Sequence, residues 1–177
     1  MINEVIQTER LILREITEND YEEIANILQD IEIMYAWEKA FSDVEVRSWI
    51  EKNINRYAKD GFSYYLAVNK LSNDVVGVMG PLVENIEEKE YIGVAYILNK
   101  KYWNKGYATE GIRACIDYAF RTLNTNKVIA QIRPENKASL NVAKRLNMKE
   151  EGEYIKIYEG KEMKHLIYSI ENINKKY

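Results

Sequence analysis

The chain has 177 residues, a length that fits one domain, which we place at 1–177 with residues 171–177 as a tail. Eight glycines and two prolines are too few for a long linker or a low-complexity chain. The 25 basic and 28 acidic residues give a formal net charge of −3, whereas a general nucleic-acid binder carries a basic surplus. We therefore expect a single globular domain with no nucleic-acid partner.

Several other kinds of site and location are disfavoured by the composition. Cys115 is the only cysteine and His165 the only histidine, so an internal disulfide is excluded and a Cys/His metal cluster is not expected. No Gly-x-Ser-x-Gly turn accompanies the histidine. The start of the chain carries Glu4 and Glu9 and lacks the apolar core of a secretory signal. The longest apolar runs fall far short of the roughly 18–20 residues of a membrane span. We expect a cytoplasmic protein without a membrane partner.

The first third of the chain predicts a strand followed by two capped helices. Residues 10–16 alternate and are rich in strand-forming side chains. The segments 17–20 and 42–45 both have capping-box spacing, with a hydroxyl three residues before a carboxylate. Apolar residues recur at helical spacing after each box. Gly61 is suited to the position that follows the second helix.

The rest of the chain predicts a sheet with two more helices. The apolar run 90–98 is typical of a central strand, and the helix after it can cross over between parallel strands. We predict strands at 63–69, 75–80, 90–98, 127–132, 149–157 and 162–170, helices at 106–123 and 137–146, and turns at 85–89 and 158–161. The fold class is therefore α+β, with a mixed, mostly antiparallel, twisted sheet of about six or seven strands and about four helices.

The segment from Tyr102 to Glu110 carries the strongest local signal for ligand binding. It reads Tyr-Trp-Asn-Lys-Gly-Tyr-Ala-Thr-Glu and joins the predicted central strand to the long helix. Gly106 and Ala108 allow close approach to the backbone. The first N–H groups of a helix have no internal partner and favour an anion, to which Lys105 adds a positive charge. The spacing matches neither a Walker loop nor Gly-x-Gly-x-x-Gly, so the segment is either a phosphate site or an ordinary helix start.

A second segment, Pro134-Glu-Asn-Lys-Ala-Ser139, precedes the other predicted helix. Asn136 is suited to cap that helix, and Ser139 lies in its first turn. On these residues alone, capping is the simpler interpretation.

Together the two segments resemble those of the GNAT N-acetyltransferase superfamily, and in particular the Rim-type branch that acetylates ribosomal-protein N-termini. The run Tyr-Trp-x-Lys-Gly-Tyr-Ala-Thr-Glu resembles its acyl-CoA pyrophosphate loop, and Asn136-x-x-Ser139 resembles its second cofactor motif. The opening Thr-Glu-Arg-Leu-Ile-Leu-Arg at 8–14 is similar to its first strand. The resemblance covers about residues 8–170 and is far more specific for fold and cofactor than for substrate.

The resemblance implies a binding mode for acetyl-CoA, in a V-shaped opening where the strands 90–98 and 127–132 splay apart. The pyrophosphate would contact backbone N–H groups of residues 105–109, and the pantetheine would run along residues 97–99. Asn136 would hydrogen-bond the cofactor arm, and Ser139 would lie near the thiol. The cofactor-binding residues implied are Ile97, Leu98, Asn99, Asn104, Lys105, Gly106, Tyr107, Ala108, Thr109, Asn136 and Ser139.

The sequence departs from the family pattern in four places. Trp103 stands where the wider superfamily has Arg or Gln, and Asn104 replaces a common glycine, although Asn tolerates a positive φ better than most residues. Ala143 stands where many members have a tyrosine that protonates the leaving thiolate. Residues 147–148 replace Gly-Phe at a helix end. Without the tyrosine, the acid is either Ser139 or water.

Direct transfer also needs a base, because the amine arrives as an ammonium. The candidates are Glu84 and Glu90, with less support for His165. Both glutamates belong to the acidic stretch 84–90, which could equally be a solvated turn. A backbone N–H on the 96–98 strand can stabilise the oxyanion.

The aromatic segment 34–41 is expected to cover the acceptor site, because loops between the first helices do so in this family. We predict Tyr35 and Trp37 as substrate-binding residues, with packing in the core or against a second subunit as the alternative. Cys115 is expected in the core and Glu110 is expected to complement the helix dipole. The oligomeric state is left as monomer or homodimer.

The resemblance thus implies an acetyl-CoA-dependent N-acetyltransferase that moves the acetyl group directly to a primary amine, with acetyl-CoA as cosubstrate and no metal. The acceptor is either a protein N-terminus, such as that of a ribosomal protein, or a small amine such as a polyamine, an amino sugar or an antibiotic. A catalytically silent acyl-CoA sensor is the alternative, suggested by Ala143 and by the lack of an evident base. An unrelated phosphate-binding α/β enzyme is a third hypothesis.

Overall fold

The computed structural model describes residues 2–175, which form one eight-stranded sheet with four α-helices. The strand order is β1-β2-β3-β4-β5-β6-β8-β7. The strands are β1 (Glu4–Gln7), β2 (Leu11–Arg14), β3 (Tyr65–Asn69), β4 (Val75–Ile86), β5 (Lys89–Leu98), β6 (Lys127–Ile132), β7 (Lys149–Tyr158) and β8 (Lys161–Glu171). The helices are α1 (Tyr21–Leu28), α2 (Asp43–Asp60), α3 (Tyr107–Arg121) and α4 (Lys137–Arg145), and short 3₁₀ turns are η1 (Glu18–Asp20), η2 (Tyr35–Trp37), η3 (Lys100–Tyr102) and η4 (Ile173–Lys175). The α+β class is confirmed, with one strand more than the upper end of the prediction.

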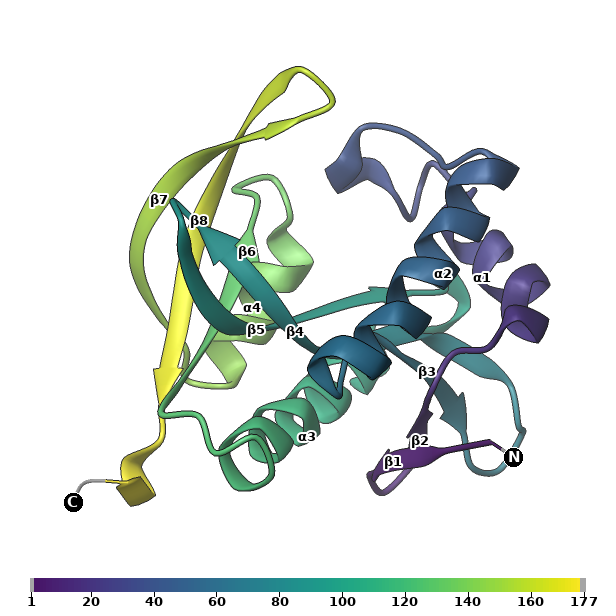
Figure 1. Ribbon diagram of the computed structural model, residues 1–177, viewed down its shortest axis with the longest axis horizontal. Coiled ribbons are helices and arrows are strands. Elements are labelled where there is room, and N and C mark those ends of the chain that lie inside the picture. The colour runs from purple at the N-terminus through teal and green to yellow at the C-terminus, as the bar shows by residue number, and fades with distance from the viewer. Residues whose placement is uncertain (1, 176–177) are drawn as a thin grey trace.

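The sheet splits at its centre. Neighbouring strands pair antiparallel except β5 and β6, which run parallel and pair only at Ile92–Val128 and Gly93–Ile129. Beyond Gly93, β5 continues along β4 as far as Leu98, while β6 continues along β8. The two halves therefore diverge, and Figure 1 shows the β6-β8-β7 half turning away from the β1-to-β5 half. The predicted splaying of the central strands is confirmed.

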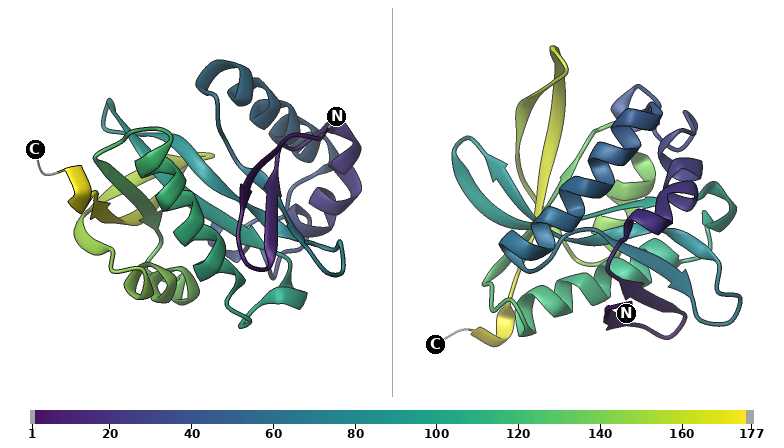
Figure 2. Two further views of the ribbon diagram at one scale, coloured as in Figure 1. Left: turned by 90° about the horizontal axis from the view of Figure 1, so that it is seen from below. Right: turned by 45° about the vertical axis from the view of Figure 1, so that its right-hand side comes forward.

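Helices cover both faces of the sheet. Figure 2 shows α1 and α2 on one side and α3 on the other. One apolar cluster joins Ile24, Leu28 and Ile50 of the first two helices to the sheet. A second joins Ile112 and the buried Cys115 of α3 to the opposite face, as predicted for that cysteine. The two cores fix the helices that flank the central split.

The predicted helix signals are confirmed. The Ser42 hydroxyl accepts from the Glu45 N–H at 3.2 Å, and the Glu45 carboxylate accepts from the Ser42 N–H at 2.8 Å. The segment 17–20 forms the same kind of box, with the carboxylate of Asp20 accepting from the N–H of Thr17 at 2.8 Å. Gly61 follows α2 with φ 85°, the left-handed conformation that glycine adopts without strain.

Several element boundaries differ from the prediction. β1 was not predicted, because it is a short edge strand in which Ile6 alone is buried. β2 is shorter than the predicted 10–16, whereas β4 extends beyond 80 to Ile86. The turn predicted at 85–89 consists of only Glu87 and Glu88, both at positive φ, so the strands on either side are longer. β8 includes residue 171, which was assigned to the tail, and residues 176–177 lie outside the described part of the chain.

No helix within residues 2–175 combines the length and apolar character needed to cross a bilayer. No group of three or more His, Cys, Asp or Glu side chains in the same range is placed to hold a metal ion.

Candidate functional site

Two adjoining cavities lie at the split between β5 and β6. The larger has a volume of about 380 Å³ and lies between α2, the central strands and the β7–β8 hairpin. The smaller has a volume of about 220 Å³ and lies between the end of β5, the loop before α3, and α4. Both are lined by Ala36, Trp37, Tyr96, Asn136, Ser139 and Val142. A ligand in the smaller cavity can therefore reach one in the larger at these residues.

The smaller cavity collects most of the predicted cofactor residues. Its lining includes Ile97, Leu98, Asn104, Gly106, Tyr107, Ala108, Thr109, Asn136 and Ser139. Two predicted residues are not among those that line it. The Asn99 side chain instead accepts from the Lys101 N–H at 3.1 Å and caps η3. The Lys105 ammonium lies over the Tyr102 ring, 5.6 Å from its centroid.

The loop before α3 has the backbone conformation that an anion site needs. Asn104 and Gly106 have φ values of 59° and 81°, which confirms that the asparagine accepts the left-handed conformation. The Trp103 indole N–H donates to the Leu98 carbonyl at 3.2 Å and ties the loop to the end of β5. A Cβ at Gly106 would lie 3.3 Å from the guanidinium of Arg10, so the loop is closely packed on that side. Residues 106–109, at the start of α3, line the smaller cavity, and the first N–H groups of a helix have no partner within it, so this end of the cavity is suited to an anion.

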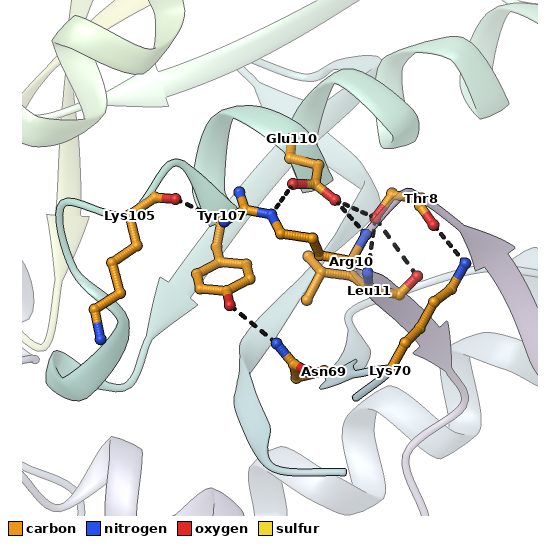
Figure 3. Close-up of polar contacts among 8 residues, drawn as sticks. All are labelled: Thr8, Arg10, Leu11, Asn69, Lys70, Lys105, Tyr107 and Glu110. Carbon is orange, nitrogen blue, oxygen red and sulfur yellow. Dashed lines mark hydrogen bonds and ion pairs between the residues drawn. The ribbon is translucent and has the colours of Figure 1, made fainter. Parts of the chain in front are cut away.

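The same loop is fixed from behind by a charged network, drawn in Figure 3. The Glu110 carboxylate accepts from the Thr8 hydroxyl at 2.7 Å, from the Arg10 N–H at 2.8 Å and from the Arg10 Nε at 2.6 Å. The other end of the guanidinium donates to the Lys105 carbonyl at 2.9 Å and lies over the Tyr107 ring. Burial alone would raise the pKa of Glu110, but the hydrogen bonds from Thr8 and Arg10 outweigh it and keep that pKa below its usual value. Glu110 therefore does more than complement the helix dipole, because it joins the β1–β2 turn to the loop.

Asn136 both caps α4 and contacts the aromatic segment. Its side-chain oxygen accepts from the Ser139 N–H at 3.1 Å and from the Tyr35 hydroxyl at 2.8 Å. This oxygen is therefore already engaged, and a hydrogen bond from Asn136 to a ligand has to come from its amide nitrogen.

Tyr96 is a site residue that the sequence analysis assigned only through its backbone. Its hydroxyl accepts a hydrogen bond from the Ser139 hydroxyl at 3.1 Å, where the two cavities meet. Burial raises the pKa of Tyr96, so its proton stays on the oxygen at neutral pH. The sequence places Tyr96 on the predicted central strand, which was the available signal for this residue. It does not show that Tyr96 contacts Ser139 on α4.

The larger cavity contains Glu84, one of the two predicted bases. The carboxylate accepts from the Gln131 amide at 3.1 Å. Burial raises the pKa of Glu84, although the positive charges of Lys156, Arg56 and Lys52 act in the opposite direction. These three cations line the same cavity and were not predicted, because they come from α2 and β7.

Of the other two candidate bases, Glu90 lies outside both cavities and His165 lies in the larger one. Glu90 is exposed, two residues after the β4–β5 turn, and is not among the residues that line either cavity. His165 lines the larger cavity, and its Nδ1 lies 3.0 Å from the Met163 carbonyl. Burial lowers the pKa of His165, which favours the neutral ring.

The aromatic segment 34–41 forms a roof over the cavities. Trp37 lines both cavities and Tyr35 lines the smaller one. Two contacts join this roof to the other half of the sheet. Arg133 donates to the Ala36 carbonyl at 2.9 Å, and Lys39 pairs with Glu159 of the β7–β8 turn at 3.0 Å. Tyr35 and Trp37, the two predicted substrate-binding residues, therefore both lie at the site, although Tyr35 lines only the smaller cavity.

Comparison with known proteins identifies the architecture. The model of the acetyltransferase (GNAT) domain family matches residues 10–149. The chain belongs to the GNAT acetyltransferase family. It is 30% identical over 152 residues to an uncharacterized N-acetyltransferase, p20, of Bacillus licheniformis, which covers 84% of each chain. It is 26% identical over 161 residues to the [ribosomal protein uS5]-alanine N-acetyltransferase of Escherichia coli (strain K12), covering 86% of this chain and 81% of that protein.

A solved structure of a GNAT-family acetyltransferase from Bacillus anthracis has the same fold. It superposes with a TM-score of 0.80 at 25% identity and covers 97% of this chain and 98% of its own. The resemblance to the ribosomal-protein acetyltransferases of the GNAT family, first indicated by the two cofactor motifs, is thereby confirmed.

The departures from the GNAT pattern have structural explanations. Ala143 lines the larger cavity and contributes no polar group to it. The hydroxyl nearby is that of Tyr96 on β5, which is hydrogen-bonded to Ser139, one turn before Ala143 on α4. Asn147, which follows the C-cap residue Leu146 of α4, has φ 60°, the conformation that a glycine often adopts at this position.

Proposed function

We propose that this protein is an acetyl-CoA-dependent N-acetyltransferase that transfers the acetyl group directly to a primary amine. The observation that carries the proposal is the junction of the two cavities at Trp37, Tyr96 and Ser139. A cofactor site and an acceptor site that meet at a small set of side chains favour direct transfer, since proximity and orientation supply much of the rate.

Acetyl-CoA would be held in the smaller cavity. Backbone N–H groups between Lys105 and Thr109 would bind the pyrophosphate, and the side of β5 from Val94 to Leu98 that lacks a β6 neighbour would pair with the pantetheine arm. The bound cosubstrate supplies an acetyl carbon whose bond to sulfur breaks as a bond to the amine nitrogen forms. A backbone N–H between Tyr96 and Leu98 would stabilise the charge that develops on the acetyl oxygen.

Glu84 is our proposed base. It lies in the larger cavity, and its raised pKa brings it closer to neutral pH than an exposed glutamate, which suits proton transfer. Directly or through a water molecule, it would take the proton that the acceptor must lose before its nitrogen can react. The Gln131 amide holds the carboxylate in place at 3.1 Å.

Tyr96 and Ser139 form the acid side. The hydroxyl of Ser139 donates to the Tyr96 oxygen, which leaves the Tyr96 proton available for the sulfur. Burial raises the pKa of Tyr96 above the ordinary value of about 10, but a phenol remains a better acid than an aliphatic hydroxyl. We therefore assign the proton to Tyr96, in place of the two candidates that the sequence left open, Ser139 and water, and treat Ser139 as its positioning residue.

The acceptor is a primary amine, and a protein N-terminus and a small molecule both remain compatible with this function. The E. coli relative named above is a uS5-alanine N-acetyltransferase, which makes a protein N-terminus one of the two candidates. The silent-sensor alternative was based on the lack of an evident acid and base. Glu84 and Tyr96 are our candidates for those roles, and their presence in the site supports an enzyme over a sensor.

Binding and turnover together test the proposal. CoA should raise the melting temperature of the protein more than ATP or NAD does, and free thiol should appear from acetyl-CoA with at least one member of a panel of amines and ribosomal N-terminal peptides. Preference for a nucleotide over CoA would contradict the cofactor assignment. Stabilisation by CoA without thiol release from any panel member would return the protein to the sensor class.

A further inference from the structure

The larger cavity has more positive charge than its single carboxylate can balance. Lys52 and Arg56 reach it from α2, and Lys156 reaches it from β7 on the other wall. Glu84 is the only acidic residue among those that line the cavity. The chain as a whole has a net charge of −3, so this concentration of cations is opposite to its overall balance.

The three cations lack carboxylate partners. Within residues 2–175, none of them takes part in an ion pair, whereas several other lysines and arginines do. No side-chain hydrogen bond occupies them in that range either. Their charged groups are therefore free to bind a ligand.

The cations also act on one another. Burial lowers the pKa of Lys52, and the positive charges of Arg56 and Lys156 lower it further, while Glu84 alone opposes them. Like charges that face one cavity repel one another, and the single carboxylate of Glu84 offsets that repulsion only in part. A ligand with a negative group would relieve that repulsion, whereas a polyamine would increase it.

We propose that the acceptor is a small primary amine that also carries a carboxylate or phosphate, and that Lys52, Arg56 and Lys156 bind this anionic group. The inference rests on the proposed function, because it names the substrate class of the same site. Since the three cations line the same cavity as Glu84 and are near enough for their charges to act on its pKa, the anionic group and the amine should be separated by only a few bonds. A cavity of about 380 Å³ with a roof tied down at Lys39 and Glu159 favours a small molecule over a peptide.

Binding to the CoA-loaded protein tests the inference without turnover. Calorimetry would compare matched probes: 2-aminoethyl phosphate with ethanolamine, and 4-aminobutyrate with 1,4-diaminobutane. In at least one pair the anionic amine should bind about tenfold or more tightly, because hydrogen bonds to charged groups are the stronger ones. The double variant Lys52→Gln/Lys156→Gln should abolish this difference.

Lys59→Gln is the matched control. It removes one positive charge from α2, as the Lys52→Gln half of the double variant does, but at an exposed position outside the larger cavity, so the preference for the anionic probe should persist. The melting temperature of each variant, with and without CoA, reports folding and cofactor binding separately from acceptor binding. Equal affinity within both pairs, no binding of any anionic probe, or tighter binding of the diamine would overturn the inference. So would a preference of the protein for N-terminal peptides over every small amine.

Failure of the inference and failure of the proposed function give different results. If the cations bind no anionic amine but neutral amines are acetylated, the function stands and the substrate class is wrong. If CoA itself does not stabilise the protein, the proposed function is wrong.

Discussion

Replacing Glu110 by glutamine should loosen the cofactor loop without touching the ligand. The carboxylate lies in the first turn of α3 and accepts three hydrogen bonds, from the Thr8 hydroxyl and from the backbone and side chain of Arg10. Arg10 in turn holds the Lys105 carbonyl (Figure 3). Glutamine keeps the size of the side chain, removes its charge, and presents an N–H₂ group to one of the donors.

The size of the effect follows from the exposure of the partners. A hydrogen bond to a charged group contributes about 1.5–3 kcal/mol when it is shielded from water. The Glu110 side chain is 19% exposed but that of Arg10 is 37% exposed, so water screens part of their attraction. We expect a total loss of about 2 kcal/mol, which for a chain of this length lowers the melting temperature by about 4–8 °C.

The stability difference should also depend on pH. The pKa of Glu110 is lower in the folded than in the unfolded chain, so its contribution is fully present above the unfolded value. The contribution is lost as pH falls through the folded-state pKa. The gap in unfolding free energy between wild type and variant should therefore shrink in acid.

Thermal unfolding at several pH values, with and without CoA, checks these expectations. Glu9→Gln, the same change at an exposed carboxylate in the β1–β2 turn, should have little effect. Glu110→Gln should in addition weaken CoA binding several-fold, because Arg10, without the Glu110 carboxylate, is held less firmly against the Lys105 carbonyl. A variant as stable as wild type, or a stability loss that persists unchanged at low pH, would refute the reasoning.

Three further predictions concern the site directly. Gly106→Trp should abolish CoA binding, because its Cβ would lie 3.3 Å from the Arg10 guanidinium at φ 81° and the bulky side chain would displace the loop that lines the smaller cavity; isothermal titration with CoA measures this. Tyr96→Phe should lower kcat by about a hundredfold and Ser139→Ala by about tenfold, each more than it weakens CoA binding, because the two hydroxyls act mainly on the proton that the thiolate receives. The rate should fall as pH drops through the raised pKa of Glu84, since a protonated carboxyl cannot accept the amine proton, and the pH–rate profile of Glu84→Gln should lack that limb.

Each of these predictions has a control in the same molecule. Gly61→Trp places the same side chain at φ 85° with open space around it, so it should bind CoA normally. Glu90→Gln alters an exposed carboxylate outside both cavities and should leave the pH–rate profile unchanged. If His165→Asn removed the acidic limb and Glu84→Gln did not, the base would be the histidine. A Tyr96→Phe variant with the turnover of wild type would exclude Tyr96 as the acid.

The cofactor side of the site could be predicted because its information is local. The run from Tyr102 to Glu110 encodes a loop, a left-handed asparagine, a glycine and a helix start within nine neighbouring positions. Asn136 and Ser139 are likewise three residues apart at the start of one helix. Capping and loop geometry depend on near neighbours, so their spacing survives in the sequence.

The acceptor side could not be predicted to the same degree because it is assembled from distant segments. Lys52 and Lys156 meet Glu84 only because α2 and β7 flank the same end of β4. The choice between Glu84 and Glu90 depended on where the β4–β5 turn falls, and the sequence placed that turn over five residues instead of two. The contact between Tyr96 and Ser139 depended on how α4 packs against β5. Such contacts are set by tertiary packing, which periodicity does not encode.

The most direct test of the account follows the acetyl group itself. Wild-type protein would be incubated with carbonyl-labelled acetyl-CoA and an amine acceptor from the panel, and the product would be examined by NMR for label in an amide bonded to the acceptor nitrogen. The account predicts labelled N-acetyl amide together with free CoA thiol, both lost in Gly106→Trp and retained in Gly61→Trp. Thiol release with the label recovered as free acetate, and no amide with any amine that the protein binds, would contradict direct transfer to an amine.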